Sequence, residues 1–204
     1  MNDLNDMELI NRFRKGQTQA FNLIVWRWQK PLLNFLYRFL GNKQDAEDVN
    51  QKTFLKVYQK ISSLKEIDRF QVWLYQVAAN EARDLLRRKK NRSFLSLGIR
   101  SKSNSSFEEN NIPDIADSET VDADNNIHQA ELRKIFENAM QEIPEEQRVV
   151  IIMKIYQDLK FAEIAEILQE SLNTIKSRMY YGLKALRQVL QKQNFSEEVL
   201  NYEM

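Results

Sequence analysis

The sequence contains no cysteine, a single histidine (His128), four glycines and three prolines among 204 residues. The absence of cysteine excludes disulfide bonds, thiolate zinc sites and a cysteine nucleophile, and one histidine cannot form a histidine-rich metal site. Because Gly and Pro are scarce while Leu, Ile, Ala, Glu, Gln and Lys are frequent, long helices are expected. The first ten residues, MNDLNDMELI, lack the basic and apolar regions of a signal peptide. We therefore expect an all-α cytoplasmic protein without a metal or other cofactor.

The net charge of +1 is distributed unevenly along the chain. Residues 1–100 contain 19 basic and 10 acidic residues, residues 101–132 contain 1 and 8, and residues 133–204 contain 10 and 11. A basic first part indicates a polyanionic partner. Between residues 93 and 126 the composition shifts to Ser, Asn, Asp and Glu, and helical periodicity is lost, which predicts a flexible acidic linker. We therefore expect one small helical domain over residues 1–92, the linker over residues 93–126, and a second helical domain over residues 127–204.

Start and stop signals predict four helices in the first domain. Asn5 and Glu8 have the spacing of a capping box, and Gly16 and Gly41 stand where two helices must end. Asp45 is predicted to cap the third helix. The fourth helix ends in the basic run RRKKNR. The expected helices cover about residues 7–15, 18–40, 45–61 and 70–90.

The segment 143–190 has the order of a helix-turn-helix unit. Pro144 opens a scaffold helix, FAEIAEIL forms a short helix, QES forms a turn, and a final helix starts at Leu172. This last helix has one apolar stripe and a separate basic face, as a recognition helix requires in order to reach bases and phosphates. Its candidate DNA-contacting residues are Asn173, Thr174, Lys176, Ser177, Arg178, Tyr180, Tyr181 and Lys184.

A lone amphipathic helix with solvated Lys and Arg side chains would fit an ordinary helical bundle equally well. Here a Pro-led helix, a short helix, a turn and a basic helix follow one another at fitting spacing. The complete order therefore favours DNA binding.

Two groups of motifs resemble the extracytoplasmic-function group of bacterial sigma factors. In the second domain these are Pro144, Arg148, Glu-Ile-Ala at 163–165 and Thr-Ile-Lys-Ser-Arg at 174–178, which resemble region four. In the first domain, DAEDVNQKTFLKVY at 45–58 and F-x-x-WLYQVAAN at 70–80, followed by DLLRR, resemble region two. The resemblance implies a dissociable RNA polymerase subunit without catalytic residues. Region two would recognise and melt the minus-ten promoter element, and region four would recognise the minus-thirty-five element.

The resemblance also implies roles for particular residues and partners. Asp48, Gln51 and Leu55 would contact core RNA polymerase, although solvated surface residues would show the same pattern. The family is commonly bound by an anti-sigma factor, so core RNA polymerase, promoter DNA and an anti-sigma factor are the expected partners. Melted DNA needs cationic and aromatic contacts. The residues expected to contact the minus-ten element are Arg69, Phe70, Asn80, Arg83, Arg87, Arg88, Lys89 and Arg92.

The sequence departs from the family pattern around the recognition helix. Gln169 replaces the usual turn glycine, and Asn173 replaces the glycine before the recognition threonine. Tyr181 and Gly182 stand where Arg and Ala are common. Asn tolerates a left-handed backbone and can cap a helix, so the fold is expected to survive. The bases that this helix contacts do not follow from the resemblance.

Two other functions fit parts of the sequence. A stand-alone helix-turn-helix regulator would bind duplex operators without polymerase, but the first domain argues against it. A nuclease would need a metal held by Asp45, Glu47 and Asp48. These carboxylates have no histidine nearby and fit the positive end of a helix better. The sequence therefore predicts a promoter-recognition subunit that is not an enzyme.

Overall fold

The computed structural model describes residues 4–96 and 123–192, and every regular element in these two ranges is a helix. The all-α prediction is confirmed for the described part of the chain. The central part of the predicted linker, residues 97–122, lies outside the described residues. Helix extends into both ends of the predicted linker, because one helix continues to Ser96 and the next begins at Ala123. We call residues 4–96 the first half and residues 123–192 the second half.

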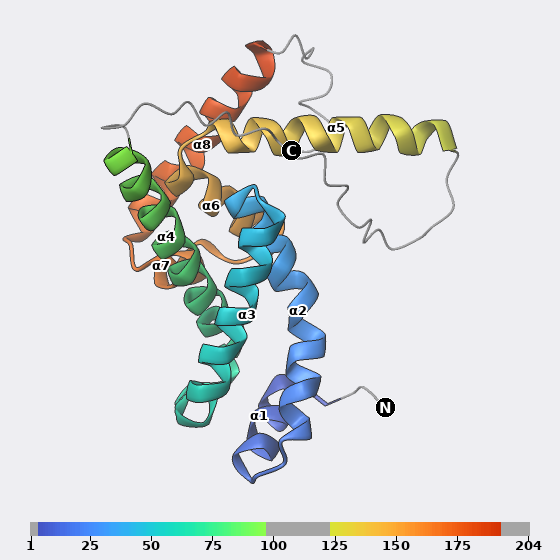
Figure 1. Cartoon of the computed structure of the whole chain (residues 1–204), viewed down its shortest axis with the longest axis vertical. Coiled ribbons are helices and arrows are strands. Elements are labelled where there is room, and N and C mark those ends of the chain that lie inside the picture. The colour runs from blue at the N-terminus through green and yellow to red at the C-terminus, as the bar shows by residue number, and fades with distance from the viewer. Residues whose placement is uncertain (1–3, 97–122, 193–204) are drawn as a thin grey trace.

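The first half contains four α-helices (Figure 1). They are α1 (Asp6–Arg14), α2 (Gln19–Leu40), α3 (Lys43–Lys60) and α4 (Phe70–Ser96). Two short 3-10 helices, Ile61–Ser63 and Ile67–Arg69, lie in the connection between α3 and α4. The central helix is α2, which packs against α1, α3 and α4.

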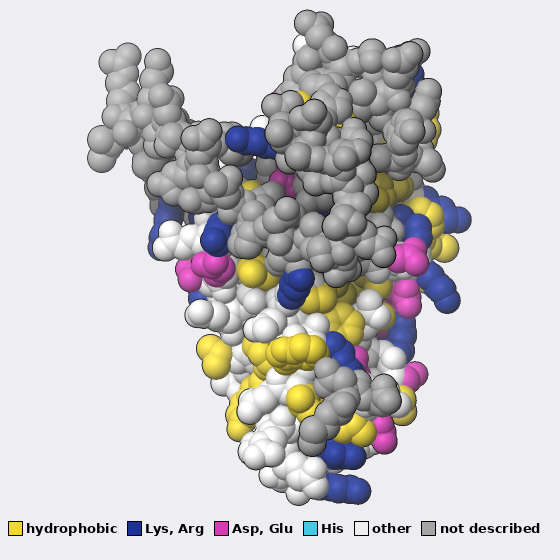
Figure 2. Space-filling model, turned by 90° about the vertical axis from the view of Figure 1, so that its right-hand side faces the viewer, with side chains coloured by type: hydrophobic (Ala, Val, Ile, Leu, Met, Phe, Trp, Pro, Cys, Tyr) yellow, Lys and Arg dark blue, Asp and Glu magenta, His cyan; other side chains and the backbone are white. Residues whose placement is uncertain are grey.

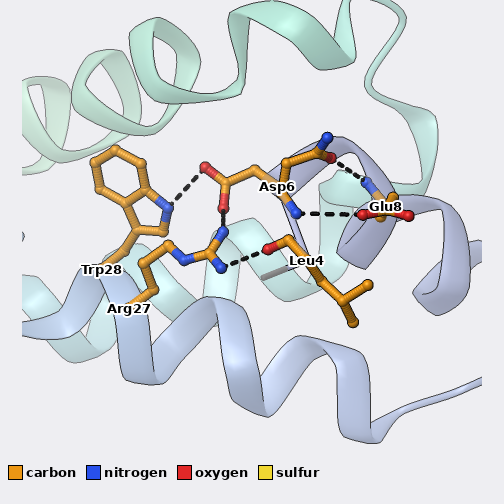
Figure 3. Close-up of polar contacts among 6 residues, drawn as sticks. Leu4, Asp6, Glu8, Arg27 and Trp28 are labelled. Carbon is orange, nitrogen blue, oxygen red and sulfur yellow. Dashed lines mark hydrogen bonds and ion pairs between the residues drawn. The ribbon is translucent and has the colours of Figure 1, made fainter. Parts of the chain in front are cut away.

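The start of α1 is fixed by a capping box and by contacts with α2. The capping box predicted at Asn5 is confirmed: its side-chain oxygen accepts the Glu8 N–H at 2.9 Å, and the Glu8 carboxylate accepts the Asn5 N–H at 3.4 Å. The Asp6 carboxylate accepts hydrogen bonds from Arg27 and from the indole N–H of Trp28, the latter at 3.1 Å (Figure 3). These contacts hold the beginning of α1 against the middle of α2.

Helix α2 ends and α3 begins within three residues. Gly41 has a left-handed backbone with φ of 71° and ends α2 as predicted. The prediction that Asp45 caps α3 is wrong, because Asn42 is the cap and its side-chain oxygen accepts the Asp45 N–H at 2.9 Å. Asp45 lies in the first turn of α3 and forms an ion pair with Lys89 of α4. Two residues that favour the cap position stand three apart here, so local preference did not decide between them.

Aromatic side chains form much of the core of the first half. Tyr75 of α4 lies edge-on to Phe35 and Trp28 of α2, with ring centroids 5.2 and 6.3 Å apart. Phe70, the first residue of α4, is also edge-on to Trp28. Such edge-to-face pairs stabilise the core beyond the burial of apolar area. They fix the first turns of α4 against α2.

The second half contains the predicted helix-turn-helix. Its helices are α5 (Ala123–Glu142), α6 (Glu145–Ile155), α7 (Phe161–Leu168) and α8 (Leu172–Lys192). Pro144 immediately precedes α6, as expected. Gln169 takes the left-handed conformation that ends α7, with φ of 56°. Ser171 caps α8, because its hydroxyl accepts the Thr174 N–H at 3.0 Å. Asn173, considered from sequence as a possible cap, is instead the second residue of α8.

Helix α8 approaches α6 closely at Gly182. A Cβ at this position would lie 2.9 Å from Cδ1 of Ile151 and 3.1 Å from Cβ of Gln147, both on α6. Both distances are shorter than ordinary van der Waals contacts between carbon atoms. The missing side chain therefore allows the recognition helix to pack tightly on the scaffold helix that precedes the helix-turn-helix.

The two halves pack against each other and share one hydrophobic core: α7 lies on α4, and α6 lies on α2 (Figure 1). Gln141 of α5 joins them, since its amide N–H donates to the Arg38 carbonyl at 2.8 Å and its amide oxygen accepts from Arg148. Gly41 leaves the space for this side chain, because a Cβ there would lie 2.6 Å from Cδ of Gln141. The Arg38 guanidinium lies 4.2 Å from the ring centre of Tyr156. The sequence did not predict this closed arrangement.

Candidate nucleic-acid interface

Six of the eight predicted DNA-contacting residues of α8 lie on its solvent-exposed surface. We call these six residues the recognition face. Their positions recur at spacings of three and four residues along the helix, so their side chains project from one side. Ser171 caps the end of α8 at which this face begins. The recognition face consists of Asn173, Lys176, Ser177, Tyr180, Tyr181 and Lys184.

Thr174 and Arg178, the other two predicted residues, are half-buried and have partners within the protein. The Thr174 hydroxyl lies 2.8 Å from that of Ser171. Arg178 forms an ion pair at 2.9 Å with Glu170 in the turn before α8. Both side chains must exchange these partners before they can contact DNA.

Two neighbouring tyrosines stand in the middle of the recognition face. The Tyr180 side chain is 66% exposed and that of Tyr181 is 57% exposed. Their ring centres are 5.3 Å apart and their planes are inclined by 76°, an edge-to-face pair. Large aromatic residues this exposed usually belong to a surface that binds a partner.

The predicted minus-ten residues of the first half fall into two groups. Arg87, Arg88, Lys89 and Arg92 are exposed near the end of α4. Arg87 is paired at 2.9 Å with Asp84, and Lys89 is paired with Asp45. Because the cation of each pair is at least half exposed to solvent, these ion pairs hold the Arg87 and Lys89 side chains weakly. This end of α4 therefore presents a cationic surface.

The second group is engaged by the second half. Arg69 forms an ion pair with Glu166 of α7. Arg83 donates to the carbonyl of Leu168 at the end of α7 at 3.4 Å and to the side-chain oxygen of Asn80 at 2.7 Å. Burial lowers the pKa of Arg83, and the carboxylate of Glu170 partly opposes this shift. The closed arrangement thus occupies two of the predicted residues, Arg69 and Arg83, whereas Asn80 is exposed and binds Arg83 within α4.

The prediction that Phe70 contacts DNA does not fit this structure. Its side chain is 1% exposed and packs against Trp28 and Trp73 in the core. The motif containing Phe70 matches a family pattern at the level of sequence, but an apolar residue at the first position of a buried helix contributes to packing. The neighbouring Tyr75 is equally buried, and burial raises the pKa of its hydroxyl.

A cleft of about 310 Å³ lies between α4 and the second half. Its α4 wall carries Arg83, Arg87 and Lys90, and its opposite wall carries Glu145, Glu146 and Glu170 among others. Asp84 of α4 and Arg178 of α8 also line the cleft, but cations predominate on its α4 side and carboxylates on the side of the second half. This complementarity supports the closed arrangement.

The predicted polymerase-binding residues share one exposed surface of α3. Asp48, Gln51 and Leu55 are all exposed and lie at helical spacing. Leu55 has 63% of its surface in solvent. Tyr58 is the next residue on the same stripe, and its ring packs edge-on against Phe21. An exposed leucine beside polar groups is consistent with a protein-binding surface.

The outer side of α2 carries a further apolar surface that the sequence analysis did not identify. Trp26 is 63% exposed, and Leu23, three residues earlier, is 40% exposed. Figure 2 shows hydrophobic side chains gathered on the lower part of the side of the molecule to which α2 belongs. From sequence, these residues were indistinguishable from the buried apolar residues around them.

The residues that join the halves were also absent from the predictions. Glu166, Gln157 and Gln141 bind Arg69, Tyr75 and Arg38, respectively. Their polar character gave no indication of these contacts, because polar residues on helices and in loops usually face solvent. Only an analysis of long-range pairing could have identified them.

The described residues support neither a metal site nor a membrane-spanning helix. These residues contain no group of three or more His, Asp or Glu side chains arranged to hold a metal ion. Asp45, a metal ligand in the nuclease alternative, is paired with Lys89. None of the helices between residues 4 and 192 that the structure describes is long and apolar enough to cross a membrane.

Comparison with protein families gives two matches in the same order as the two halves. The family model described as Sigma-70 region 2 matches residues 24–92. The model described as Sigma-70, region 4 matches residues 133–186. The first match contains most of α2, all of α3 and most of α4, and the second contains α6, α7 and most of the recognition helix.

Similar proteins of established identity match over nearly their whole length. The ECF RNA polymerase sigma factor SigW of Bacillus subtilis is 30% identical over 181 residues, which are 89% of this chain and 94% of that protein. The ECF RNA polymerase sigma-E factor of Escherichia coli is 30% identical over 183 residues, 90% of this chain and 93% of that protein.

Solved structures with a similar fold include CnrH in complex with the cytosolic domain of CnrY, with a TM-score of 0.63 and 20% identity. That match covers 92% of this chain and 97% of the other. Another is the sigma factor RpoE in complex with the anti-sigma factor NepR from Bartonella quintana, with a TM-score of 0.65 and 21% identity. It covers 85% of this chain and 98% of the other. At these identities the likeness shows the fold alone.

Proposed function

The chain belongs to the extracytoplasmic-function group of the sigma-70 family of RNA polymerase sigma factors, and on this basis we propose that it directs core RNA polymerase to promoters with two separate DNA elements. The observation that carries the proposal is the presence of both family regions, in order, each with an exposed surface of the chemistry its role requires. The protein itself makes no bond in RNA, so its role is recognition and positioning and not enzymatic catalysis.

The second half binds the duplex at the minus-thirty-five element. The amino-terminal turns of α8 enter the major groove, where Asn173, Lys176 and Ser177 reach base edges or phosphates. Lys184 contacts the backbone farther along the helix. Thr174 and Arg178 contribute after exchanging their present partners, Ser171 and Glu170.

The first half binds and opens the minus-ten element. Arg87, Arg88, Lys89 and Arg92 hold the phosphates of the melted strand, because the end of α4 already presents these cations to solvent. Arg69, Asn80 and Arg83 join the interface once the second half no longer occupies Arg69 and Arg83. We do not retain Phe70 as a DNA contact, since it is a core residue.

Recognition of both elements requires the halves to separate. Elements centred at minus ten and minus thirty-five are about 25 base pairs apart, or about 85 Å along duplex DNA at about 3.4 Å per base pair. In the closed arrangement Arg69 of the first half contacts Glu166 of the second half directly. The closed arrangement is therefore that of the protein away from a promoter, and binding of core polymerase must stabilise a more extended one.

Core polymerase binds the exposed stripe of α3 formed by Asp48, Gln51 and Leu55. An exposed leucine between polar residues gives such an interface an apolar centre and a polar rim. An anti-sigma factor is a further partner. This part of the proposal is supported by the family and by the complex of RpoE with NepR, in which a sigma factor of similar fold is bound to an anti-sigma factor. The protein acts where RNA polymerase acts, in the cytoplasm.

The proposal is tested by reconstitution. Core RNA polymerase from a bacterium is combined with the purified full-length chain and a pool of genomic DNA fragments, and the 5′ ends of the transcripts are mapped. We expect discrete start sites only when the chain is present. Leu55→Asp should abolish these starts by weakening polymerase binding, whereas Lys60→Asp, an exposed residue at the end of the same helix, should not.

The same transcripts with and without the chain would contradict the proposal. Tight sequence-specific duplex binding by the chain alone, without any effect on polymerase, would instead indicate the stand-alone regulator.

A further inference from the structure

The tyrosine pair of α8 is the only part of the recognition face with a large apolar surface. The other four members carry amide, hydroxyl or ammonium groups. Both rings remain mostly in solvent, although other aromatic residues of the second half, such as Phe161, are partly buried against the core. A partner that covers this face would therefore need an apolar group that meets the rings.

Charged and polar groups on both sides of the pair define what that partner is. Lys176 precedes Tyr180 by one turn and Lys184 follows it by one turn, and neither lysine has an ion-pair partner among the described residues. The two lysines are eight residues apart, about 12 Å along the helix axis at about 1.5 Å per residue. A recognition helix lies in the major groove, so both lysines stand beside the groove that the rings face. The lysines can approach phosphates at the edges of the groove while the rings face its floor.

The floor of the major groove offers one kind of apolar group. Its other groups are hydrogen-bond donors or acceptors of the four bases, and the exception is the C5-methyl group of thymine. An aromatic ring on the recognition helix therefore has one well-matched contact on a base edge.

We propose that Tyr180 and Tyr181 form a preassembled pair that recognises thymine methyl groups in the upstream promoter element. This inference rests on the proposed function, because it assigns a base preference to the helix that binds that element. Lys176 and Lys184 supply the attraction to phosphates, and the tyrosine pair supplies the preference for sequence.

The geometry of the pair supports this role. Each ring restricts the rotation of the other through the edge-to-face contact at 5.3 Å. Side chains ordered before binding lose less conformational entropy when they bind. The close approach of α8 to α6 at Gly182, the residue after Tyr181, also restricts the backbone that carries both rings.

The test compares thymine with uracil, which makes the same base pair but lacks the methyl group. Holoenzyme made from the full-length chain selects bound duplexes from a library with a randomised upstream segment. The preferred duplex is then synthesised with each thymine of the upstream element replaced singly by uracil, and binding is measured by fluorescence anisotropy. We expect a loss of about fourfold at each contacted position, equivalent to about 0.8 kcal/mol for one buried carbon at about 1.4 kcal/mol per factor of ten.

Variants then assign the methyl effect to the rings. In the double variant Tyr180→Ala/Tyr181→Ala, thymine and uracil duplexes should bind equally. Tyr180→Phe/Tyr181→Phe should keep the fourfold difference, because the hydroxyl groups are not needed. Lys184→Ala is the matched control: it should weaken both duplexes by the same factor and make binding less dependent on salt.

Three results would overturn the inference: no uracil effect with the wild-type chain, a uracil effect that survives in the double alanine variant, or its loss in the double phenylalanine variant. A library that yields no preferred upstream sequence would overturn the proposed function together with the inference. A preferred sequence with no methyl effect would remove the inference alone.

Discussion

Helices α8 and α4 carry the two predicted DNA-contacting surfaces. The closed arrangement leaves most of the first surface exposed and covers part of the second. On α8, six of the eight predicted residues lie on one exposed face. On α4 and the turn before it, Arg69 and Arg83 contact the second half, and Phe70 is buried. The proposed surface for duplex DNA is thus exposed in the closed protein, whereas two residues of the proposed surface for melted DNA are released only when the halves separate. The difference agrees with the order of events at a promoter, where duplex is bound before it is melted.

Among the variants of the closed arrangement, removal of the Gln141 side chain should change the free energy of unfolding most. Gln141→Ala removes one of two acceptors of the buried Arg148, which also donates to the Met140 carbonyl at 3.4 Å, and removes the donor to the Arg38 carbonyl. Burial already lowers the pKa of Arg148, because desolvation penalises the charged guanidinium, so the loss of a polar partner is costly. We expect the free energy of unfolding to fall by about 2–3 kcal/mol, the cost of leaving buried polar groups without partners. Urea denaturation would measure this loss.

Gln188→Ala, at an exposed position of α8, is the control and should change stability little. Equal stability of the two variants would show that Gln141 does not join the halves.

The variant Lys176→Ala tests whether the exposed recognition face of α8 is available to bind DNA. The side chain is exposed and has no ion-pair partner to give up among the described residues, so its loss should weaken binding of the upstream element by about 2 kcal/mol, within the range for a hydrogen bond to a charged group such as phosphate. Arg178→Ala should have a smaller effect, because Arg178 must first leave Glu170. Competition binding of holoenzyme to promoter duplexes would rank the two. A larger loss for Arg178→Ala would reverse our assignment.

The hydrogen bond between Tyr75 and Gln157 is another contact between the two halves, and Tyr75 is a core residue of the first half. Tyr75→Phe keeps the buried ring and removes only the hydroxyl, which donates to the Gln157 side-chain oxygen. We expect a loss of about 1 kcal/mol in the free energy of unfolding. A double-mutant cycle with Gln157→Ala is the decisive measurement, since two residues that contact each other should not give additive effects. Additivity would mean that this contact does not form in solution.

The ion pair between Arg69 and Glu166 should give the smallest change. Both side chains are more than 40% exposed, so charge reversal in Glu166→Arg should cost less than about 1 kcal/mol of stability. It nevertheless removes one of the two carboxylates paired with Arg69, leaving only the exposed pair with Glu66 at 3.7 Å, and the free chain should bind a labelled single-stranded oligonucleotide more tightly at low salt. Glu47→Arg, which makes the same charge change on an exposed part of α3, is the control. If both variants gain equally, the gain reflects net charge and not release of Arg69.

The local features of the fold were largely predictable from sequence. The capping box at Asn5, the helix end at Gly41 and the helix-turn-helix after Pro144 are confirmed, because each depends on residues within one or two turns of one another. The exposed face of α8 followed from helical periodicity. The cap of α3 was predicted wrongly, since Asn42 and Asp45 are both suitable and lie within the same turn.

The candidate site was predictable only in part. The sequence located the basic end of α4 and the exposed stripe of α3, but it placed the buried Phe70 among the DNA contacts. It also did not identify Trp26, whose exposure depends on how α2 packs against the rest of the first half. Composition shows that a residue is apolar, but only its neighbours in space show whether it is covered.

The sequence by itself determined the helices, their faces and the membership of the sigma family, because caps, periodicity and short motifs are properties of neighbouring residues. The tertiary structure alone decided which predicted residues are available to DNA. Arg69 and Glu166 are 97 residues apart in the chain, and Arg83 and Leu168 are 85 apart. Contacts over such separations depend on how whole helices pack, and the free energy of that packing is a sum over many residues that no local pattern contains.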